Sequence, residues 1–243
     1  MELNSRFIPE LMAKATEINR EMATMDADAR LQFAYSIFGD GLIATTSFGR
    51  DAALLLHHLH RLKIPIRVFF IDTGFHFPET LAYSDILTKE YQLRLEKVAS
   101  ADPNRRQYAT SHRGELTISD IDACCAMNKV AVQRAFLELP NVMAFCSGLR
   151  RDQSAHRKEL PFAMVQRDRI KIAPFVDWPQ SDVDLYLKLW EVTEHPLARE
   201  GYSSIGCSPL TCTRKPLPGE NSRSGRWAGD AKTECGLHTD LES

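Results

Sequence analysis

Six cysteines are the residues of this chain best suited to chemistry, and one of them stands apart near the end of the sequence. Cys235 lies in the charged run Glu234-Cys235-Gly236-Leu237-His238, where a side chain contributes little to a core. A thiolate is strongly nucleophilic, and a cysteine on a flexible tail can reach a bound substrate and then a second protein. An isolated tail cysteine is usually a chance surface residue, but the rest of the sequence favours a catalytic role for Cys235.

Four further cysteines form two pairs, Cys124 with Cys125 and Cys207 with Cys212. Four thiolates can bind one iron–sulfur cluster or a structural zinc ion. Adjacent side chains diverge and fit a tetrahedral zinc site poorly, whereas a cubane offers different iron atoms to the two sulfurs. We therefore expect a [4Fe–4S] cluster on these four cysteines, with zinc or no metal as the alternatives. The sixth, Cys146, lies in an apolar run and is expected in the core.

Two predicted strand ends carry residues that can bind an anion. The first turn holds Ser47, Phe48, Gly49 and Arg50, and hydroxyls, a glycine and free backbone N–H groups at a helix start favour phosphate binding. It lacks the Walker pattern, and a plain turn capped by its serine is the alternative.

The second turn holds Asp72, Thr73 and Gly74, with a capping loop as the alternative. Because ligands of open α/β sheets bind at the carboxyl ends of strands, the two loops together predict a nucleotide cleft.

Basic side chains cluster at several places although the formal net charge is −2. Arginine suits bidentate contacts with phosphate or sulfate, so local anion recognition is expected. Ordinary surface charge is the alternative for each of these residues. The candidates for substrate binding are Lys129, Arg150, Arg151, Arg157, Arg223 and Arg226.

Strand and helix patterns alternate along most of the chain, which predicts an α/β fold with a mostly parallel sheet covered by helices on both faces. Helices are expected over 9–20, 26–38, 52–62, 78–91, 126–137 and 180–190. Strands are expected over 41–47, 66–71, 93–98, 142–147, 162–166 and 170–175. Periodicity ends after Gly206, so we expect a nucleotide-binding domain over 1–206 and a flexible catalytic tail over 207–243.

Composition sets limits on the class of protein. The 243 residues are 44% hydrophobic and 26% charged, which suits a folded chain with a sizeable core. No apolar run is long enough to span a bilayer, and the start lacks the plan of a secretory signal. We expect a cytoplasmic protein with no nucleic-acid or membrane partner.

These motifs, in this order, resemble those of the adenylyl-sulfate and phosphoadenylyl-sulfate reductases of sulfur assimilation. The resemblance covers residues 40 to 239. It rests on TSFG at 46–49, DTGFHFPET at 72–80, CC at 124–125, GLRRDQS at 148–154, EHPL at 194–197, GYSSIGC at 201–207 and ECGLH at 234–238.

The resemblance implies an adenine-nucleotide α-hydrolase-like fold and reductive release of sulfite from an activated sulfate. In that family the cysteine matching Cys235 attacks the sulfonate sulfur, and thioredoxin or glutaredoxin then reduces the S-sulfocysteine. The two cysteine pairs accompany a cluster and usually a preference for adenylyl sulfate over 3′-phosphoadenylyl sulfate. We therefore expect an adenylyl-sulfate reductase, and homo-oligomers are usual in the family.

Three departures from the family pattern bear on these expectations. The last cysteine pair has four intervening residues where the family has two, Asn128 replaces an arginine before Lys129, and Arg50-Asp51 replaces an acidic pair. Arg50 could contact a 3′-phosphate, which makes 3′-phosphoadenylyl-sulfate reductase the first alternative. Others are a non-catalytic iron–sulfur sensor and a sulfate-activating pyrophosphatase on the same fold.

Overall fold

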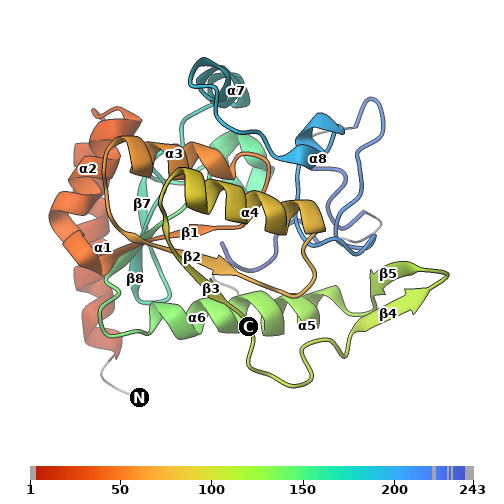
Figure 1. The fold of residues 1–243 in the computed structure, drawn as a ribbon. Helices are drawn as coiled ribbons and strands as arrows, with labels where there is room; N and C mark the ends of the chain where they lie inside the picture. The colour runs from red at the N-terminus through yellow and green to blue at the C-terminus, as the bar shows by residue number, and fades with distance from the viewer. Residues whose placement is uncertain (1–3, 221–222, 229, 231, 239–243) are drawn as a thin grey trace.

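A computed structural model of the protein describes residues 4–220, 223–228, 230 and 232–238. Its centre is a six-stranded sheet in the order β3-β2-β1-β6-β8-β7 (Figure 1). The neighbours are parallel except for β7, which runs antiparallel to β8. The strands are β1 (Leu42–Thr46), β2 (Arg67–Ile71), β3 (Arg94–Val98), β6 (Ala144–Cys146), β7 (Ala163–Gln166) and β8 (Arg169–Ile172). The expected mostly parallel α/β fold is confirmed.

Helices cover both faces of this sheet. The larger layer contains α1 (Asn4–Met22), α2 (Ala27–Phe38), α3 (Ala52–Arg61) and α4 (Pro78–Glu90). The other face is covered by α6 (Ala131–Leu137), which continues a helix begun by α5 (Ile121–Cys125). In Figure 1, α3 and α4 lie above the strands, α1 and α2 lie to their left, and α6 lies below. Helix α7 (Gln180–Leu189) is at the top of that view, and α8 (Pro196–Arg199) is at the right.

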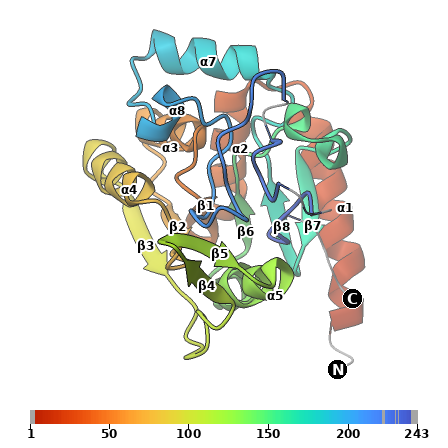
Figure 2. The same ribbon diagram turned by 90° about the vertical axis from the view of Figure 1, so that its right-hand side faces the viewer.

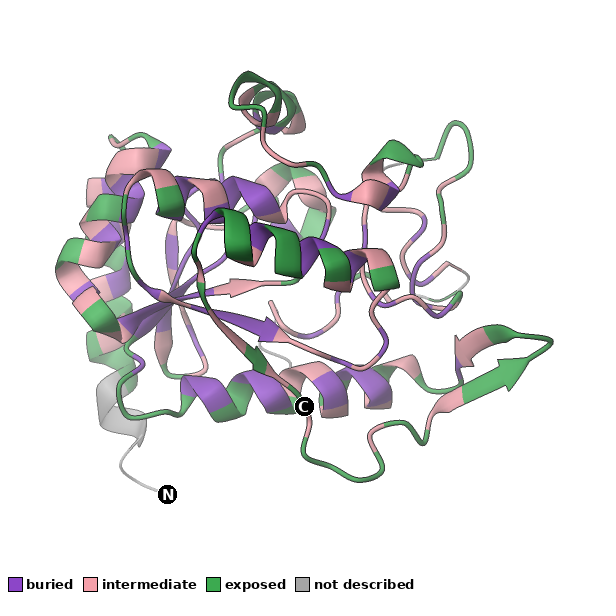
Figure 3. Cartoon of the chain, in the orientation of Figure 1, coloured by how far each residue is buried: buried purple, intermediate pink, exposed green. Residues whose placement is uncertain are grey.

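The central strands alternate between the two layers with the period of two that a strand imposes. Ala44, Val68 and Cys146 are buried with α1 to α4, whereas Ile43, Phe69 and Phe145 are buried with α6. These strands are accordingly buried in Figure 3. Both sets are apolar, as expected for parallel strands that are covered on both sides. The predicted core position of Cys146 is confirmed, since it is fully buried.

Local signals fixed several helix ends correctly. Asp26 caps α2 by accepting a hydrogen bond from the Ala29 N–H at 2.8 Å. Gly39 ends the same helix with a φ of 49°, a conformation that glycine adopts more readily than other residues. The helix expected from residue 9 instead begins at Asn4 and contains Pro9.

Three elements were not expected. A hairpin of β4 (Ala109–His112) and β5 (Glu115–Ile118) projects from the body and is largely exposed (Figure 3). The helix expected from 126 begins at Ile121, and a π-helical turn, Ala126–Val130, joins its two parts. The short helix α8 is the third.

Beyond Arg199 the described residues form turns and isolated bridges instead of helices or strands. This segment packs against the domain: His76 pairs with Cys207, Thr213 pairs with Arg226, and Trp227 is buried. Residues 232–238 return to the carboxyl ends of the strands, in front of β1, β6 and β8 in Figure 2. The expected tail is therefore docked in this structure, and the boundary at residue 206 stays a prediction.

No helix in the described part of the chain has the length and apolar character to cross a bilayer.

Candidate active site

A cavity of about 380 Å³ lies at the carboxyl ends of β1, β2 and β6. From β1 the chain forms β2 and β3 on one side, and it later crosses to form β6 on the other side of β1. The cavity therefore occupies the switch point where open α/β sheets bind ligands. Its volume is in the range of small-molecule sites. Loops, the π-helical turn and the C-terminal segment all contribute to its wall.

The turn after β1 contributes Ser47, Gly49 and Arg50 to this wall, as predicted. A Cβ on Gly49 would lie 3.1 Å from the Ile205 carbonyl oxygen, so a larger residue would crowd the loop. Phe48 does not line the cavity. Its ring is fully buried and packs edge-on against Phe70 at 5.0 Å, so its role is to anchor the turn.

The turn after β2 contributes Thr73 alone of the three predicted residues. The Asp72 carboxylate accepts a hydrogen bond from the Gly74 N–H at 2.8 Å, which closes the turn on itself. Gly74 has a φ of 71° and serves that turn. Asp72 and Gly74 therefore shape the loop without lining the cavity, while the Thr73 hydroxyl lies 3.4 Å from the Cys207 sulfur.

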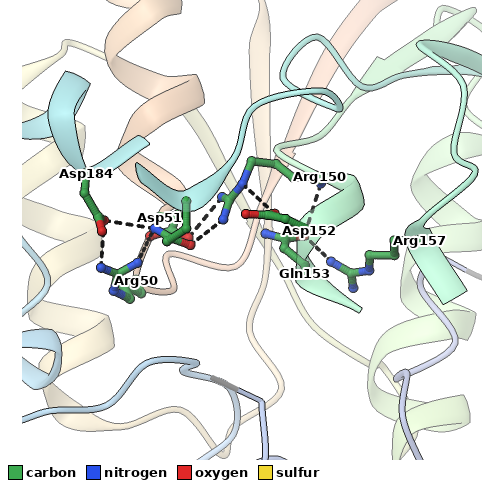
Figure 4. Close-up of polar contacts among 8 residues, drawn as sticks. Arg50, Asp51, Arg150, Asp152, Gln153, Arg157 and Asp184 are labelled. Carbon is green, nitrogen blue, oxygen red and sulfur yellow. Dashed lines mark hydrogen bonds and ion pairs between the residues drawn. The ribbon is translucent and has the colours of Figure 1, made fainter. Parts of the chain in front are cut away.

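One side of the cavity is an ion-pair network centred on Asp51 (Figure 4). Arg50 donates to Asp51 and to Asp184 at 2.8 Å each, and Arg150 donates to the other Asp51 oxygen at 3.0 Å. Arg150 also contacts Asp152 at 3.2 Å, and its side chain is only 1% exposed. These two predicted arginines are thus brought together, and both are paired with carboxylates.

A second group of cations lies beyond Gln153, whose side-chain oxygen accepts hydrogen bonds from the Arg150 backbone N–H and from Arg157 (Figure 4). Arg157 donates to both oxygens of Glu234, at 2.8 and 2.7 Å. Arg223 lies 3.7 Å from the same carboxylate, and Arg226 places its guanidinium 4.5 Å from the centre of the Trp227 ring. Burial, together with the charge of Arg157, lowers the pKa of Arg223 to about 10.

Arg151 is not part of the site. Its Nε donates to the Leu160 carbonyl at 2.9 Å, and its guanidinium lies over the Phe162 ring. The neighbouring arginines of the sequence motif therefore separate, with Arg150 toward the cavity and Arg151 into the packing below it.

The cavity wall is strongly cationic. Among its described residues, six basic side chains face three carboxylates, although the whole chain has a formal net charge of −2. The basic residues are Arg50, Lys129, Arg150, Arg157, Arg223 and Arg226, and the acids are Asp51, Asp152 and Glu234. Such a wall attracts a multiply charged anion.

Cys235 lies in this wall, half-buried beside Lys129. Burial alone would raise the pKa of the thiol. Lys129, the Leu237 N–H and Arg226 outweigh burial, so that the pKa of Cys235 lies below its ordinary value. Lys129 in turn keeps a raised pKa despite burial, because it faces the sulfurs of Cys207, Cys125 and Cys235. This pairing favours a reactive thiolate.

The four cysteines predicted to bind a cluster all line a second, smaller cavity next to the first. Cys124, Cys125, Cys207 and Cys212 all line it, together with Lys129 and Thr73. The four-residue spacing does not displace Cys212, because a tight turn from Pro209 returns it to the others. Burial raises the pKa of Cys125 to about 11 and that of Cys212 to about 12.

The donor set is that of a thiolate-bound group, and the side chains as they stand surround a small space. The cavity measures about 10 Å³, which is room for a single water molecule. Within the described residues, no three His, Cys, Asp or Glu side chains converge closely enough to bind one metal ion.

Comparisons with known proteins match this architecture. The family described as "Phosphoadenosine phosphosulfate reductase domain" matches residues 41–213. The chain belongs to this reductase family.

Adenosine 5′-phosphosulfate reductase of Streptomyces coelicolor is 37% identical over 96% of this chain and 97% of its own length. Phosphoadenosine 5′-phosphosulfate reductase of Gloeobacter violaceus is 38% identical over 90% of this chain and 91% of its own. The crystal structure of phosphoadenylyl-sulfate reductase from Candida auris, a phosphate complex, superposes with a TM-score of 0.66 at 25% identity, covering 79% of this chain and 93% of that one. The resemblance to the sulfate-assimilating reductases is therefore confirmed, and the chain is an enzyme of that family.

Several residues in or near the reductase cavity had no role assigned from sequence. Glu234 lies inside a motif that was recognised, but its ion pair with Arg157 joins positions far apart in the chain. Asp184 likewise meets Arg50, and Asp51 meets Arg150, only through the fold. Arg167 follows a strand-like run and carried no sequence signal beyond that of a turn, although it contacts the C-terminal segment.

Proposed function

We propose that this enzyme reduces adenylyl sulfate to sulfite and AMP, with Cys235 as the nucleophile. The observation that carries the proposal is a thiol of lowered pKa in the wall of a cationic, nucleotide-sized cavity. Activated sulfates carry negative charge on both phosphate and sulfonate, so their binding and reaction need the charge neutralisation that this wall supplies.

In the first step, the Cys235 thiolate attacks the sulfonate sulfur. A sulfur–sulfur bond forms, the bond from sulfur to the phosphate oxygen breaks, and its electron pair leaves with AMP. Lys129, Arg223 and Arg226 lie where they can neutralise the sulfonate oxygens and the leaving phosphate. The backbone around Ser47 and Gly49 offers N–H groups to the nucleotide phosphate.

In the second step, a dithiol protein reduces the S-sulfocysteine, and we propose thioredoxin or glutaredoxin as this partner. One thiolate of the partner attacks the Cys235 sulfur, and sulfite leaves with the electron pair of the sulfur–sulfur bond. The second thiol resolves the mixed disulfide, so the partner's dithiol supplies both electrons. The six free cysteines of the chain suit the reducing cytoplasm in which such a donor stays reduced.

We further propose that Cys124, Cys125, Cys207 and Cys212 hold a [4Fe–4S] cluster. All four line one small cavity beside Lys129, which supports this proposal, and no three of the described His, Cys, Asp or Glu side chains lie close enough to share a single zinc ion. When bound, the cluster would supply fixed charge and rigidity next to the substrate. The electrons of the reaction come from the dithiol partner.

Two features favour adenylyl sulfate over its 3′-phosphorylated form. Relatives named for each of the two substrates are similarly identical to this chain, so the choice of substrate depends on features of the site. Arg50, the residue that could receive a 3′-phosphate, already pairs with Asp51 and Asp184. A further phosphate there would meet two carboxylates. The gathered cysteine pairs are the second feature.

Cys235→Ser tests the proposal against Cys146→Ala, which removes a fully buried core thiol that does not line the cavity. Purified enzyme receives each nucleotide with thioredoxin, and sulfite is measured alongside nucleotide binding. We expect Cys235→Ser to lose sulfite formation and keep binding, while Cys146→Ala keeps both. Unchanged turnover in Cys235→Ser would reject this cysteine as the nucleophile.

Mass spectrometry of the parent enzyme completes the test. An SO₃ adduct on the C-terminal peptide is expected after incubation with adenylyl sulfate alone. Absence of sulfite from both nucleotides would favour the non-catalytic sensor instead. Preference for the 3′-phosphorylated nucleotide would favour the alternative reductase. The homo-oligomer expected from the family stays a prediction that sedimentation can check.

A further inference from the structure

The turn between β7 and β8 reaches across to the C-terminal segment next to Cys235. Arg167, the first residue of this turn, donates from Nη2 to the Gly236 carbonyl at 2.8 Å and from Nη1 to the Leu237 carbonyl at 3.4 Å. The same guanidinium contacts the buried Gln133 of α6. One side chain thus joins the hairpin, a helix and the chain immediately after Cys235.

The backbone of this turn is unfavourable for the residues that form it. Arg167 and Asp168 have φ values of 50° and 55°, and two-residue hairpins with two positive φ angles normally use asparagine or glycine. Non-glycine residues keep such a conformation where the surrounding contacts require it, and such strain concentrates at functional positions. Here the contacts of Arg167 with the C-terminal segment provide a reason.

The segment is also held on the other side of Cys235. Glu234 makes its two-oxygen ion pair with Arg157. Gly236 packs so closely against the π-helical turn before α6 that a Cβ there would lie 2.9 Å from the Val130 side chain. Cys235 therefore lies between two fixed neighbours, and the Arg167 contacts secure the second of them.

We propose that Arg167 is a positioning residue that latches the nucleophile segment over the cavity during attack on sulfur. This inference rests on the proposed function of Cys235. The two half-reactions need opposite states of the segment. Attack on the sulfonate needs Cys235 inside the cavity, whereas reduction needs a partner protein to reach the S-sulfocysteine. A latch made of hydrogen bonds to carbonyls on one short segment can open without unfolding the domain.

The first test measures access to Cys235 with iodoacetamide, using mass spectrometry of individual peptides. Arg167→Gln should raise the alkylation rate of Cys235 roughly tenfold, because charge-assisted hydrogen bonds are lost. Arg169→Gln is the matched control, since it removes the same charge from the same hairpin and Arg169 contacts the Asp168 carbonyl. Buried Cys146 should remain unreacted in both variants. Equal alkylation of Cys235 in Arg167→Gln and the parent would overturn the latch.

The second test separates the two half-reactions. Arg167→Gln should slow formation of the S-sulfocysteine from adenylyl sulfate, yet leave its reduction by thioredoxin as fast as in the parent or faster. Arg167→Lys should give an intermediate effect, because one ammonium cannot reproduce the planar contact to neighbouring carbonyls. An equal slowing of both half-reactions would indicate a merely structural role and overturn the proposal.

The outcomes also separate this inference from the proposed function. If the parent enzyme forms no S-sulfocysteine, the proposed function fails, and alkylation still shows whether Arg167 restrains the segment. If the parent forms the adduct and Arg167→Gln changes neither access nor the first step, only the latch fails. Should Arg167→Gln not fold, Arg167→Lys carries both measurements.

Discussion

Lys129 is the residue on which the reactivity of Cys235 depends most. It lies in the wall of both cavities and faces three cysteine sulfurs. Burial opposes a thiolate at Cys235, and the ammonium of Lys129 is the leading influence in the other direction. A neutral side chain of similar size at position 129 would remove the strongest of the influences that oppose burial and lower the pKa of Cys235.

Lys129→Gln should therefore raise the pKa of Cys235. Below that pKa the thiolate fraction falls about tenfold per pH unit. The variant should accordingly show slower sulfur attack near neutral pH, and should recover as the pH increases. Peptide-resolved alkylation of Cys235 across a pH series measures the midpoint directly. Lys97→Gln, which removes a surface partner of Asp85, is the control and should leave the midpoint in place. An unchanged midpoint in Lys129→Gln would show that Lys129 does not tune the thiol.

At the scale of elements, helix α7 influences the nucleotide loop through one carboxylate. Asp184 on α7 accepts a hydrogen bond from Nη2 of Arg50, while Asp51 accepts one from Nη1. Asp184 is half exposed, so the pair is screened by solvent and its effect is modest.

Asp184→Asn should make 3′-phosphoadenylyl sulfate a better substrate relative to adenylyl sulfate. The kcat/KM for 3′-phosphoadenylyl sulfate, divided by that for adenylyl sulfate, should rise roughly two- to fivefold, which corresponds to the free energy of an exposed ion pair. Asp182→Asn, on the same helix, provides a matched loss of charge. A ratio that does not move, or that moves equally in both variants, would remove Arg50 from the argument on substrate choice.

Elements with a clear apolar period were predictable, and elements without one were not. The strands of the core carry continuous hydrophobic runs, and Asp26 and Gly39 mark the ends of α2 with side-chain and backbone chemistry. The β4–β5 hairpin has polar, exposed residues, among them Thr110 and Thr117, whose hydroxyls bond to each other. Nothing in such a segment alternates toward a core, so its pairing could not be inferred from pattern.

At the scale of the whole molecule, a mildly acidic chain concentrates positive charge at one edge of its sheet. Anions should be drawn to that edge by a local field that salt screens.

Affinity for AMP should consequently fall as salt rises. Between about 0.05 and 0.5 M NaCl, the dissociation constant should increase by roughly tenfold, with the screening length shortening accordingly. Isothermal titration calorimetry measures this, and adenosine, which lacks the phosphate, is the matched ligand control. If the two ligands respond equally to salt, the cationic wall is not what binds the phosphate.

The location of the site followed from sequence because the carboxyl ends of parallel strands share one edge. That rule predicted that the turns after β1 and β2 share one cleft, and Ser47 and Thr73 line the same cavity. The pairing of individual charges did not follow from it. Arg150 and Asp51 meet across 99 positions of sequence, and the inward or outward direction of Arg150 and Arg151 depends on packing that only the folded chain displays.

The π-helical turn at Ala126–Val130 sets the rotation of α5 about the helix axis relative to α6. Each residue of an α-helix advances the chain by about 100° around the axis. If one residue of this turn were deleted, Phe136 would still pack on the sheet. Cys124 and Cys125, however, would rotate about the helix axis away from Cys207 and Cys212. A related sequence that lacks one residue at this point is therefore expected not to bring its four sulfurs together, even if every cysteine is still present.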